Sequence, residues 1–171
     1  MTRPDSPKKH EPIAGIGRHG EHPYGDLGQI IILFVFLAIW ILDSFVFRYS
    51  TFLSASVPIY LRLIFAGLIL VLAIYLVRSG HRAASDDVLS SSRLITDGAF
   101  SRVRHPLYLA SLLFYLFLIA LTLSLISLLV FMGIFIFYNA IAAYEEKFLE
   151  KKFGKDYSDY RKKVPRWIPR L

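Results

Sequence analysis

Long apolar stretches separated by short polar segments form the main pattern of this chain. The first, Leu27–Phe47, has 21 residues and a single charge, Asp43, and the second, Val57–Val77, has the same length and carries Arg62 near its start. A helix of roughly 20 apolar residues crosses a bilayer core, so each stretch predicts a transmembrane helix. The link at 48–56 is short, and the two helices are therefore expected to form a hairpin.

The two charges in this hairpin, Asp43 and Arg62, fall toward the same end of it. Ionisable residues inside membrane segments often mark functional sites. Long side chains near the interface can instead extend to the headgroups. The sequence leaves open whether the two residues pair.

A third apolar stretch, Leu107–Tyr138, contains 32 residues and no charge. As one straight helix it would extend about 48 Å, well beyond a hydrocarbon core of about 30 Å. Its middle reads ALTLSLIS, in which the hydroxyls of Thr122, Ser124 and Ser127 can satisfy the backbone groups of a turn. We therefore predict a short, tight hairpin of two helices.

The second helix of that hairpin is predicted to leave the membrane and to continue to about Phe153, where Gly154 provides a stop. Positive charge is distributed unevenly around the spans. The link at 48–56 carries one Lys or Arg, the segment 78–106 carries five, and Lys147–Arg170 carries nine of the twenty. Basic segments next to spans stay cytoplasmic, so the chain between the last two must cross an even number of times.

These patterns predict an all-α integral membrane protein with about four transmembrane helices, the last two a short tight hairpin, plus a cytosolic C-terminal helical segment. We expect four parts: a flexible polar tail at 1–26, a helical hairpin at 27–77, a cytosolic loop at 78–106, and 107–171 with the hydrophobic hairpin and C-terminal segment. Both termini are expected in the cytosol, in a bacterial or archaeal inner membrane. The tail shows no signal-peptide pattern.

Composition narrows the function classes. The chain has 171 residues, is 55% hydrophobic, has a net charge of +7 and contains no cysteine. Disulfides, thiolate metal sites and cysteine nucleophiles are thereby excluded. The basic segments beside the spans predict contact with anionic lipid headgroups rather than nucleic acid. The tail histidines, His10, His19 and His22, are expected to be solvated, and no metal site is predicted.

The hairpin prediction brings two polar motifs to one membrane face. RVRHPLY at 102–108 offers cations, an imidazole and a proline at a helix start, and AAYEEKFLEKKFG at 142–154 offers adjacent carboxylates. Such a cluster at the apolar mouth of a helix bundle suits a small charged ligand such as S-adenosylmethionine. A nicotinamide dinucleotide or a lipid phosphate would also suit it. The candidate binding residues are Arg104, His105, Pro106, Tyr108, Tyr144, Glu145 and Glu146.

Two stretches carry a family resemblance: LITDGAFSRVRHPLYLA at 94–110 and YEEKFLEKKFGKDYSDYRKKVPRWIP at 144–169. With the hydrophobic hairpin between them, they resemble the isoprenylcysteine carboxyl methyltransferases and phospholipid methyltransferases of membranes. The resemblance implies a cytosol-facing S-adenosylmethionine site and a lipid-like or prenylated acceptor that enters from the bilayer. It also implies that His105 and Tyr108 contact the cofactor, that Arg104 and Pro106 shape the site, and that Glu145 and Glu146 are its acidic partners.

One departure from the isoprenylcysteine pattern is the lack of an arginine shortly before the glutamates, where Ile141 to Tyr144 contain no cation. This puts methylation of a prenylcysteine carboxylate in doubt and leaves amine, thiol and other acceptors open. Two other functions are considered: an NADPH-dependent membrane reductase of the sterol-reductase type and a non-catalytic membrane assembly module.

Two structural expectations complete the sequence analysis. Tyr157, Tyr160, Val164 and Trp167 recur near helical spacing and are expected to form an amphipathic segment at the membrane interface. Gly67 and Gly133 are expected to permit close helix packing.

Overall fold

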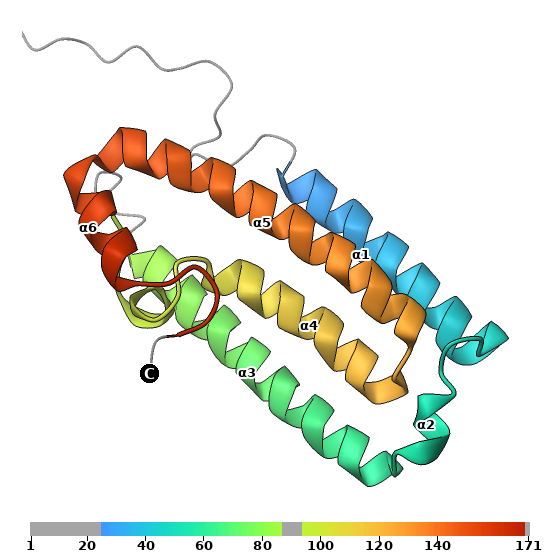
Figure 1. The fold of residues 1–171 in the computed structure, drawn as a ribbon. Coiled ribbons are helices and arrows are strands. Elements are labelled where there is room, and N and C mark those ends of the chain that lie inside the picture. The colour runs from blue at the N-terminus through green and yellow to red at the C-terminus, as the bar shows by residue number, and fades with distance from the viewer. Residues whose placement is uncertain (1–24, 87–93, 170–171) are drawn as a thin grey trace, which may run out of the picture.

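A computed structural model describes residues 25–86 and 94–169, and every regular element in these two ranges is helical. The elements are α1 (Gly25–Ile41), η1 (Leu42–Phe47), α2 (Leu53–Ser56), α3 (Ile59–Asp86), η2 (Gly98–Ser101), α4 (Pro106–Thr122), α5 (Leu125–Phe153) and α6 (Lys155–Lys163) (Figure 1). The all-α class is therefore confirmed. The expected tail, with its three histidines, falls almost entirely outside the described residues.

Three helical segments are long and apolar enough to cross a membrane: Leu27–Phe47, Ile59–Arg82 and Leu125–Phe153. Pro106–Thr122 is a shorter apolar helix. The first of these segments matches the predicted span residue for residue, and α5 ends at Phe153 with Gly154 as its C-cap, as predicted. The number of membrane crossings and the location of the termini stay predictions.

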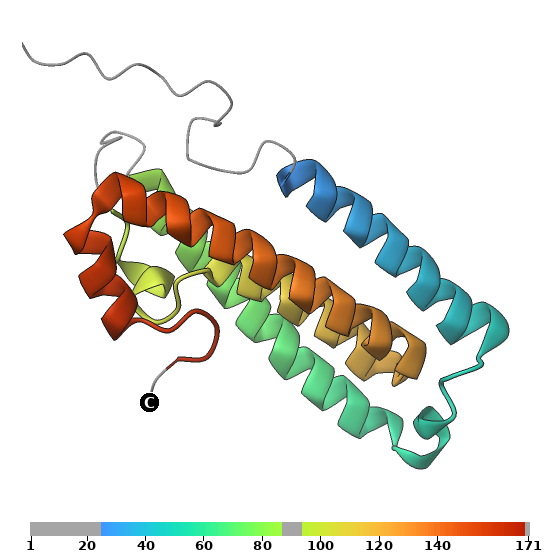
Figure 2. The same cartoon turned by 45° about the horizontal axis from the view of Figure 1, so that its top comes forward.

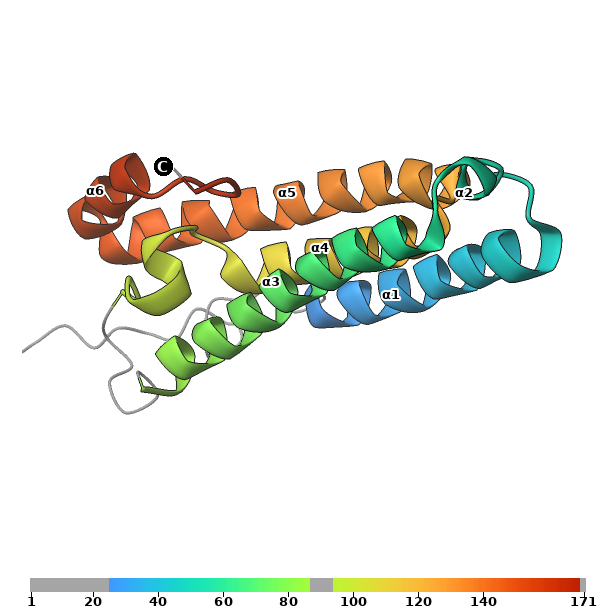
Figure 3. The same ribbon diagram turned by 90° about the horizontal axis from the view of Figure 1, so that it is seen from below.

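The long helices form two packed pairs that meet through the α4–α5 hairpin. α3 packs on α4, and α1 packs on α5 (Figure 1). In Figure 2, α3, α4 and α5 lie together and α1 runs along their side. The main core lies between α1, α4 and α5, around Phe36, Tyr115, Leu118 and Tyr138. The end of the bundle where α4 begins is called the site end, and the end where the chain turns from α4 into α5 is called the turn end (Figure 3).

At the turn end the chain reverses over two residues, Leu123 and Ser124, which confirms the predicted hairpin. Leu123 adopts the left-handed conformation, with φ of 53°. The hydroxyl of Ser124 caps α5 by accepting a hydrogen bond from the backbone N–H of Ser127 at 3.0 Å. This is the hydroxyl-supported turn that the sequence predicts.

Asp43 and Arg62 do not form an ion pair with each other. Asp43 is 4% exposed and accepts hydrogen bonds from the backbone N–H and hydroxyl of Ser50 and from the hydroxyl of Ser124. Arg62 instead donates from Nη1 to the carbonyl oxygen of Leu121 at 2.9 Å. Both residues thus attach other segments to the α4–α5 turn, Asp43 from η1 and Arg62 from α3.

The predicted loop at 78–106 begins later than expected, because α3 continues to Asp86. Gly80 does not end the helix, since it lies where α3 touches α4. A Cβ atom at Gly80 would come within 2.8 Å of Leu107 Cδ2. Gly67 and Gly133 have no neighbouring atom within 4 Å of such a Cβ, so the prediction that they permit close packing was wrong.

Candidate functional site

The site end is organised around the start of α4, which the sequence RHP fixes. His105 is the N-cap residue of α4 and Pro106 is its first residue. Proline suits this position because its φ angle is already helical and the N–H it lacks has no partner inside the helix. The segment before it is held by the C-terminal region, since the backbone N–H of Arg104 donates to the carbonyl oxygen of Pro165 at 3.0 Å.

Glu146, near the end of α5, is the most enclosed charged group of the site, with 3% of its surface exposed. Its carboxylate lies 3.2 Å from His105 Nε2 and 3.0 Å from Arg104 Nη1. Arg166 donates two hydrogen bonds to the same carboxylate, from Nε to Oε1 at 2.8 Å and from Nη2 to Oε2 at 2.7 Å. A carboxylate this buried needs such partners, because isolated buried charge is strongly unfavourable.

Glu145 completes the other side of the histidine. Its Oε2 lies 3.6 Å from His105 Nδ1, and its Oε1 accepts a hydrogen bond from the hydroxyl of Tyr108. The rings of His105 and Tyr108 are stacked, with centroids 5.6 Å apart and planes 3° from parallel. The imidazole therefore lies between two carboxylates, which orient both of its ring nitrogens.

Three site residues were missed by the sequence analysis: Asn139, Arg166 and Trp167. Residues 164–169, which we call the strap, run back across the site end. Arg166 Nη1 and Trp167 Nε1 both donate to Asn139 Oδ1, at 2.7 and 3.2 Å. The Trp167 ring lies 6.0 Å from His105. Hydrogen bonds to Glu146 raise the pKa of Arg166.

The sequence of the strap contains a recognisable motif, but we interpreted it as a membrane-interface segment. Val-Pro-Arg-Trp follows a strongly basic helix, and its aromatic and apolar residues were expected at the membrane interface. Tyr157 and Val164 are instead buried in the protein, 1% and 7% exposed. Tyr160 donates its hydroxyl to the carbonyl oxygen of Phe100 at 2.7 Å. The interfacial interpretation was therefore wrong for this segment, which packs on the protein.

Of the seven residues predicted from sequence, five meet in this cluster: Arg104, His105, Tyr108, Glu145 and Glu146. Pro106 shapes it by starting α4. Tyr144 is 51% exposed and lies about 200° around the helix from Glu146, on a different face of α5. Arg166, which follows the glutamates in the sequence, brings a further cation to Glu146.

Some hydrogen-bonding capacity at the site is unused within the described residues. Arg104 Nε and Nη1 and the hydroxyl of Tyr157 are buried without a hydrogen-bond partner there, although Nη1 makes its ion-pair contact with Glu146. Burial raises the pKa of Tyr157, and the negative charge of Glu146 acts in the same direction. Buried polar groups without partners are uncommon and can mark places where a ligand binds.

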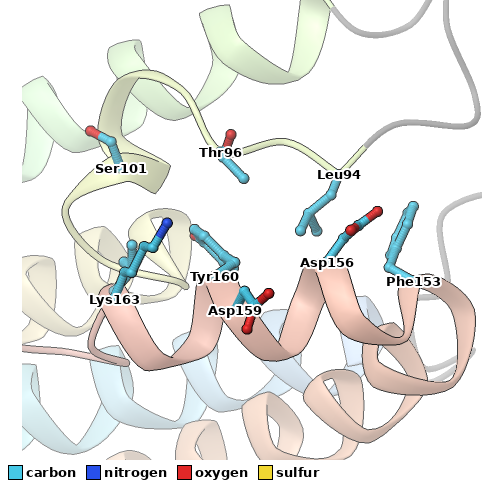
Figure 4. Close-up of a pocket in the computed structure, with 9 residues that line it drawn as sticks. Leu94, Thr96, Ser101, Phe153, Asp156, Asp159, Tyr160 and Lys163 are labelled. Atoms are coloured by element: carbon cyan, nitrogen blue, oxygen red, sulfur yellow. The ribbon is translucent and has the colours of Figure 1, made fainter.

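A separate groove of about 710 Å³ lies between α6 and the segment 94–101. Figure 4 shows Asp156, Asp159, Tyr160 and Lys163 of α6 beneath Thr96 and Ser101. None of the seven predicted residues lines it. This groove and the charged cluster are therefore different places.

The profile of the phospholipid methyltransferase family matches residues 58–156. The chain belongs to this family. The match runs from the start of α3 into α6, so it contains all seven predicted site residues but not Arg166 or Trp167. Family membership, together with helices long enough to cross a bilayer, makes this phospholipid methyltransferase family member an integral membrane protein.

Two curated relatives resemble parts of this family member. The cobalt-zinc-cadmium resistance protein CzcN of Cupriavidus metallidurans is 34% identical over 82 residues, which cover 47% of the chain and 38% of that protein. A protein-S-isoprenylcysteine O-methyltransferase of Schizosaccharomyces pombe is 38% identical over 77 residues, covering 44% of the chain and 33% of that protein. The chain thus matches between a third and two fifths of each relative's length. No solved structure matches.

Proposed function

We propose that this protein transfers a methyl group from S-adenosylmethionine to a lipid-like or prenylated acceptor at the membrane–cytosol interface. The observation that carries the proposal is the closure of the α4–α5 hairpin, which sets His105 between Glu145 and Glu146. Membership of the phospholipid methyltransferase family supports the reaction class.

The donor set fits the proposed methyl donor. S-adenosylmethionine carries a carboxylate, an ammonium group, ribose hydroxyls and an aromatic base, and when bound it supplies a methyl group activated by positively charged sulfur. The Arg104 guanidinium, whose Nε has no hydrogen-bond partner in the described residues, suits the carboxylate, and Glu145 suits the ammonium or the ribose. Tyr108 and Trp167 offer aromatic surface beside His105.

The chain's own residues contribute position and the exclusion of water. Glu146 is held by Arg104, His105 and Arg166, so it serves as the anchor of the site. The strap covers His105 with Trp167 and ties α5 to the segment before α4. Holding two reactants in line in a dry site is the larger part of what a methyl transfer needs from a protein.

Binding of cofactors by the purified protein in detergent tests the proposal and its two rivals. Calorimetric titration should detect S-adenosylmethionine and S-adenosylhomocysteine. Binding of NADPH with neither of these would favour the reductase, and binding of none would favour the assembly module. Incubation with a lipid extract and methyl-labelled donor then identifies the acceptor.

A matched pair of tyrosine variants tests which hollow binds the donor. Tyr108→Phe keeps the ring stacked on His105 but removes the hydroxyl that donates a hydrogen bond to Glu145. It should weaken S-adenosylmethionine binding by about three- to ten-fold. Tyr160→Phe removes a hydroxyl in the groove beside α6 and should leave the affinity unchanged. If Tyr160→Phe weakens S-adenosylmethionine binding and Tyr108→Phe does not, the donor site lies in that groove instead.

A further inference from the structure

Asn139 is the only amide side chain among residues 125–143, the apolar part of α5. An amide in an apolar helix is costly unless it finds hydrogen-bond partners. Its partners in this structure come from the strap, because Asn139 Oδ1 accepts from Arg166 Nη1 at 2.7 Å and from Trp167 Nε1 at 3.2 Å. Asn139 therefore ties the strap to α5 about two helical turns before Glu146.

The hydrogen bond from Trp167 to Asn139 fixes the direction of the indole ring. In Figure 3 the strap leaves α6 and runs back along α5. The Trp167 ring lies 5.8 Å from the ring of Phe135 on α5 and 6.0 Å from the ring of His105. The position of this ring beside His105 therefore depends on the acceptor that Asn139 provides.

The charged cluster beside the strap is nearly closed to solvent. Glu146 is 3% exposed and His105 is 8% exposed. The side chains of Arg104 and Glu145 are 11% and 16% exposed. A ligand of the size of S-adenosylmethionine can reach these groups only if one of the surrounding elements moves, as lids do in many enzymes.

The strap is the element best suited to make this movement. α4 and α5 share the main core, and α6 is anchored by Tyr157, which is 1% exposed. The strap contains no helix or strand, and its Ile168 is 80% exposed. Val164 is buried and holds its start. The part that follows is held by side-chain hydrogen bonds, of which Asn139 accepts two.

We propose that Asn139 is a positioning residue for the methyl donor. It latches the strap over the bound donor, and release of this latch sets the rate at which the donor enters and its product leaves. The inference rests on the proposed function for the donor, but the latch itself stands on the contacts between Asn139 and the strap. The position of the strap and the exchange of ligand are therefore measured separately.

Trp167 itself reports the position of the strap, because the chain contains only two tryptophans. The other, Trp40, donates to Thr122 at the turn end, and Trp40→Phe removes its signal. Quenching by acrylamide is measured in this background, with the full-length protein in detergent and no ligand. Asn139→Leu should raise the quenching constant of Trp167 roughly three-fold, because the strap opens locally more often. Ala140→Leu adds the same side chain at the next position, which is exposed, and should leave the constant unchanged.

Exchange of radiolabelled S-adenosylhomocysteine, the product of the donor, tests the consequence for the site. Asn139→Leu removes two hydrogen bonds from the closed strap, so the dissociation rate should rise about ten-fold and the association rate should rise as well. Asn139→Asp keeps an oxygen acceptor for both donors, and both rates should stay within about two-fold of the wild type. General damage to the site would instead slow association, so the direction of this rate separates the latch from a purely structural role.

The outcomes separate the latch from the proposed function. Equal quenching of Trp167 in Asn139→Leu and Ala140→Leu overturns the latch. Stronger quenching in Asn139→Leu with unchanged exchange rates, or with slower association, overturns the positioning role. Stronger quenching in a protein that binds neither S-adenosylmethionine nor S-adenosylhomocysteine supports the contact of Asn139 with the strap, but it overturns the proposed methyl transfer and the positioning role together.

Discussion

Removal of the Arg166 guanidinium should be the most informative single change at the site end. Arg166→Gln eliminates two charge-assisted hydrogen bonds to Glu146, at 2.8 and 2.7 Å, and one to Asn139 at 2.7 Å. Breaking a buried ion pair from one side costs about 3–5 kcal/mol when the remaining charge has no other partner. Glu146 keeps Arg104 at 3.0 Å and His105 at 3.2 Å, so we expect a smaller loss, about 2–3 kcal/mol.

Thermal unfolding in detergent, followed by the loss of helical circular dichroism, measures this loss. For a chain of this length 1 kcal/mol corresponds to about 2–4 °C, so the apparent Tm should fall by about 4–12 °C. Arg166→Lys keeps the positive charge but cannot donate from two nitrogens of a planar guanidinium. The apparent Tm of this variant should therefore lie between those of the wild type and Arg166→Gln.

The matched control is Arg161→Gln. Arg161 pairs with Glu150 at 3.3 Å, but their side chains are 48% and 47% exposed, so the loss should be at most about 1 kcal/mol. An Arg166→Gln protein that unfolds at the same temperature as Arg161→Gln would refute the view that the strap stabilises the site through Glu146.

Three further outcomes are expected. Asp43→Asn replaces one acceptor oxygen by a donor and should lower the unfolding free energy by about 1–3 kcal/mol, measured by denaturation, without changing S-adenosylmethionine affinity. Gly67→Ala should show the full helix-propensity gain of about 1 kcal/mol, whereas Gly80→Ala should lose it to the clash with Leu107; equal stabilities would contradict the close packing. Cysteines introduced next to residue 1 and residue 171 should both resist a membrane-impermeant reagent in intact cells, and labelling of either one would exclude two cytosolic termini.

The hairpin at the centre of the site could be predicted because several independent constraints agree on it. A charge-free stretch of 32 residues is too long for one crossing, and hydroxyl residues stand at its middle. The hairpin places His105 and Glu146 at the same end of the bundle, although 41 positions separate them. Local composition and the length of the apolar stretch were enough to predict the hairpin.

The contact made by Arg166 could not be predicted in the same way. Nine Lys and Arg residues lie between Lys147 and Arg170, and the neighbouring sequence does not distinguish the one that binds Glu146. The choice depends on the direction that the chain takes at Gly154, where φ is +54°, and on the burial of Tyr157 and Val164 against the site. These are tertiary effects, which a pattern of charges does not encode.

The boundary of α3 shows a similar limit. Arg78, Gly80 and His81 appear as the start of a polar loop when hydrophobicity alone is considered. The helix continues because Gly80 lets α3 approach Pro106 and Leu107 of α4. A residue that weakens an isolated helix can therefore extend one that has a close neighbour.

The position of the strap has a consequence for the order in which the protein is made. Glu146 leaves the ribosome twenty residues before Arg166, and until then its carboxylate has only Arg104 and His105 as partners. The membrane helices can insert and pair during that interval, but the charge balance at their end is incomplete. Synthesis that stops before residue 166 would therefore produce a chain that carries all of its spans and no finished site. In such a chain Glu146 lacks the two hydrogen bonds that Arg166 donates to it in the mature protein.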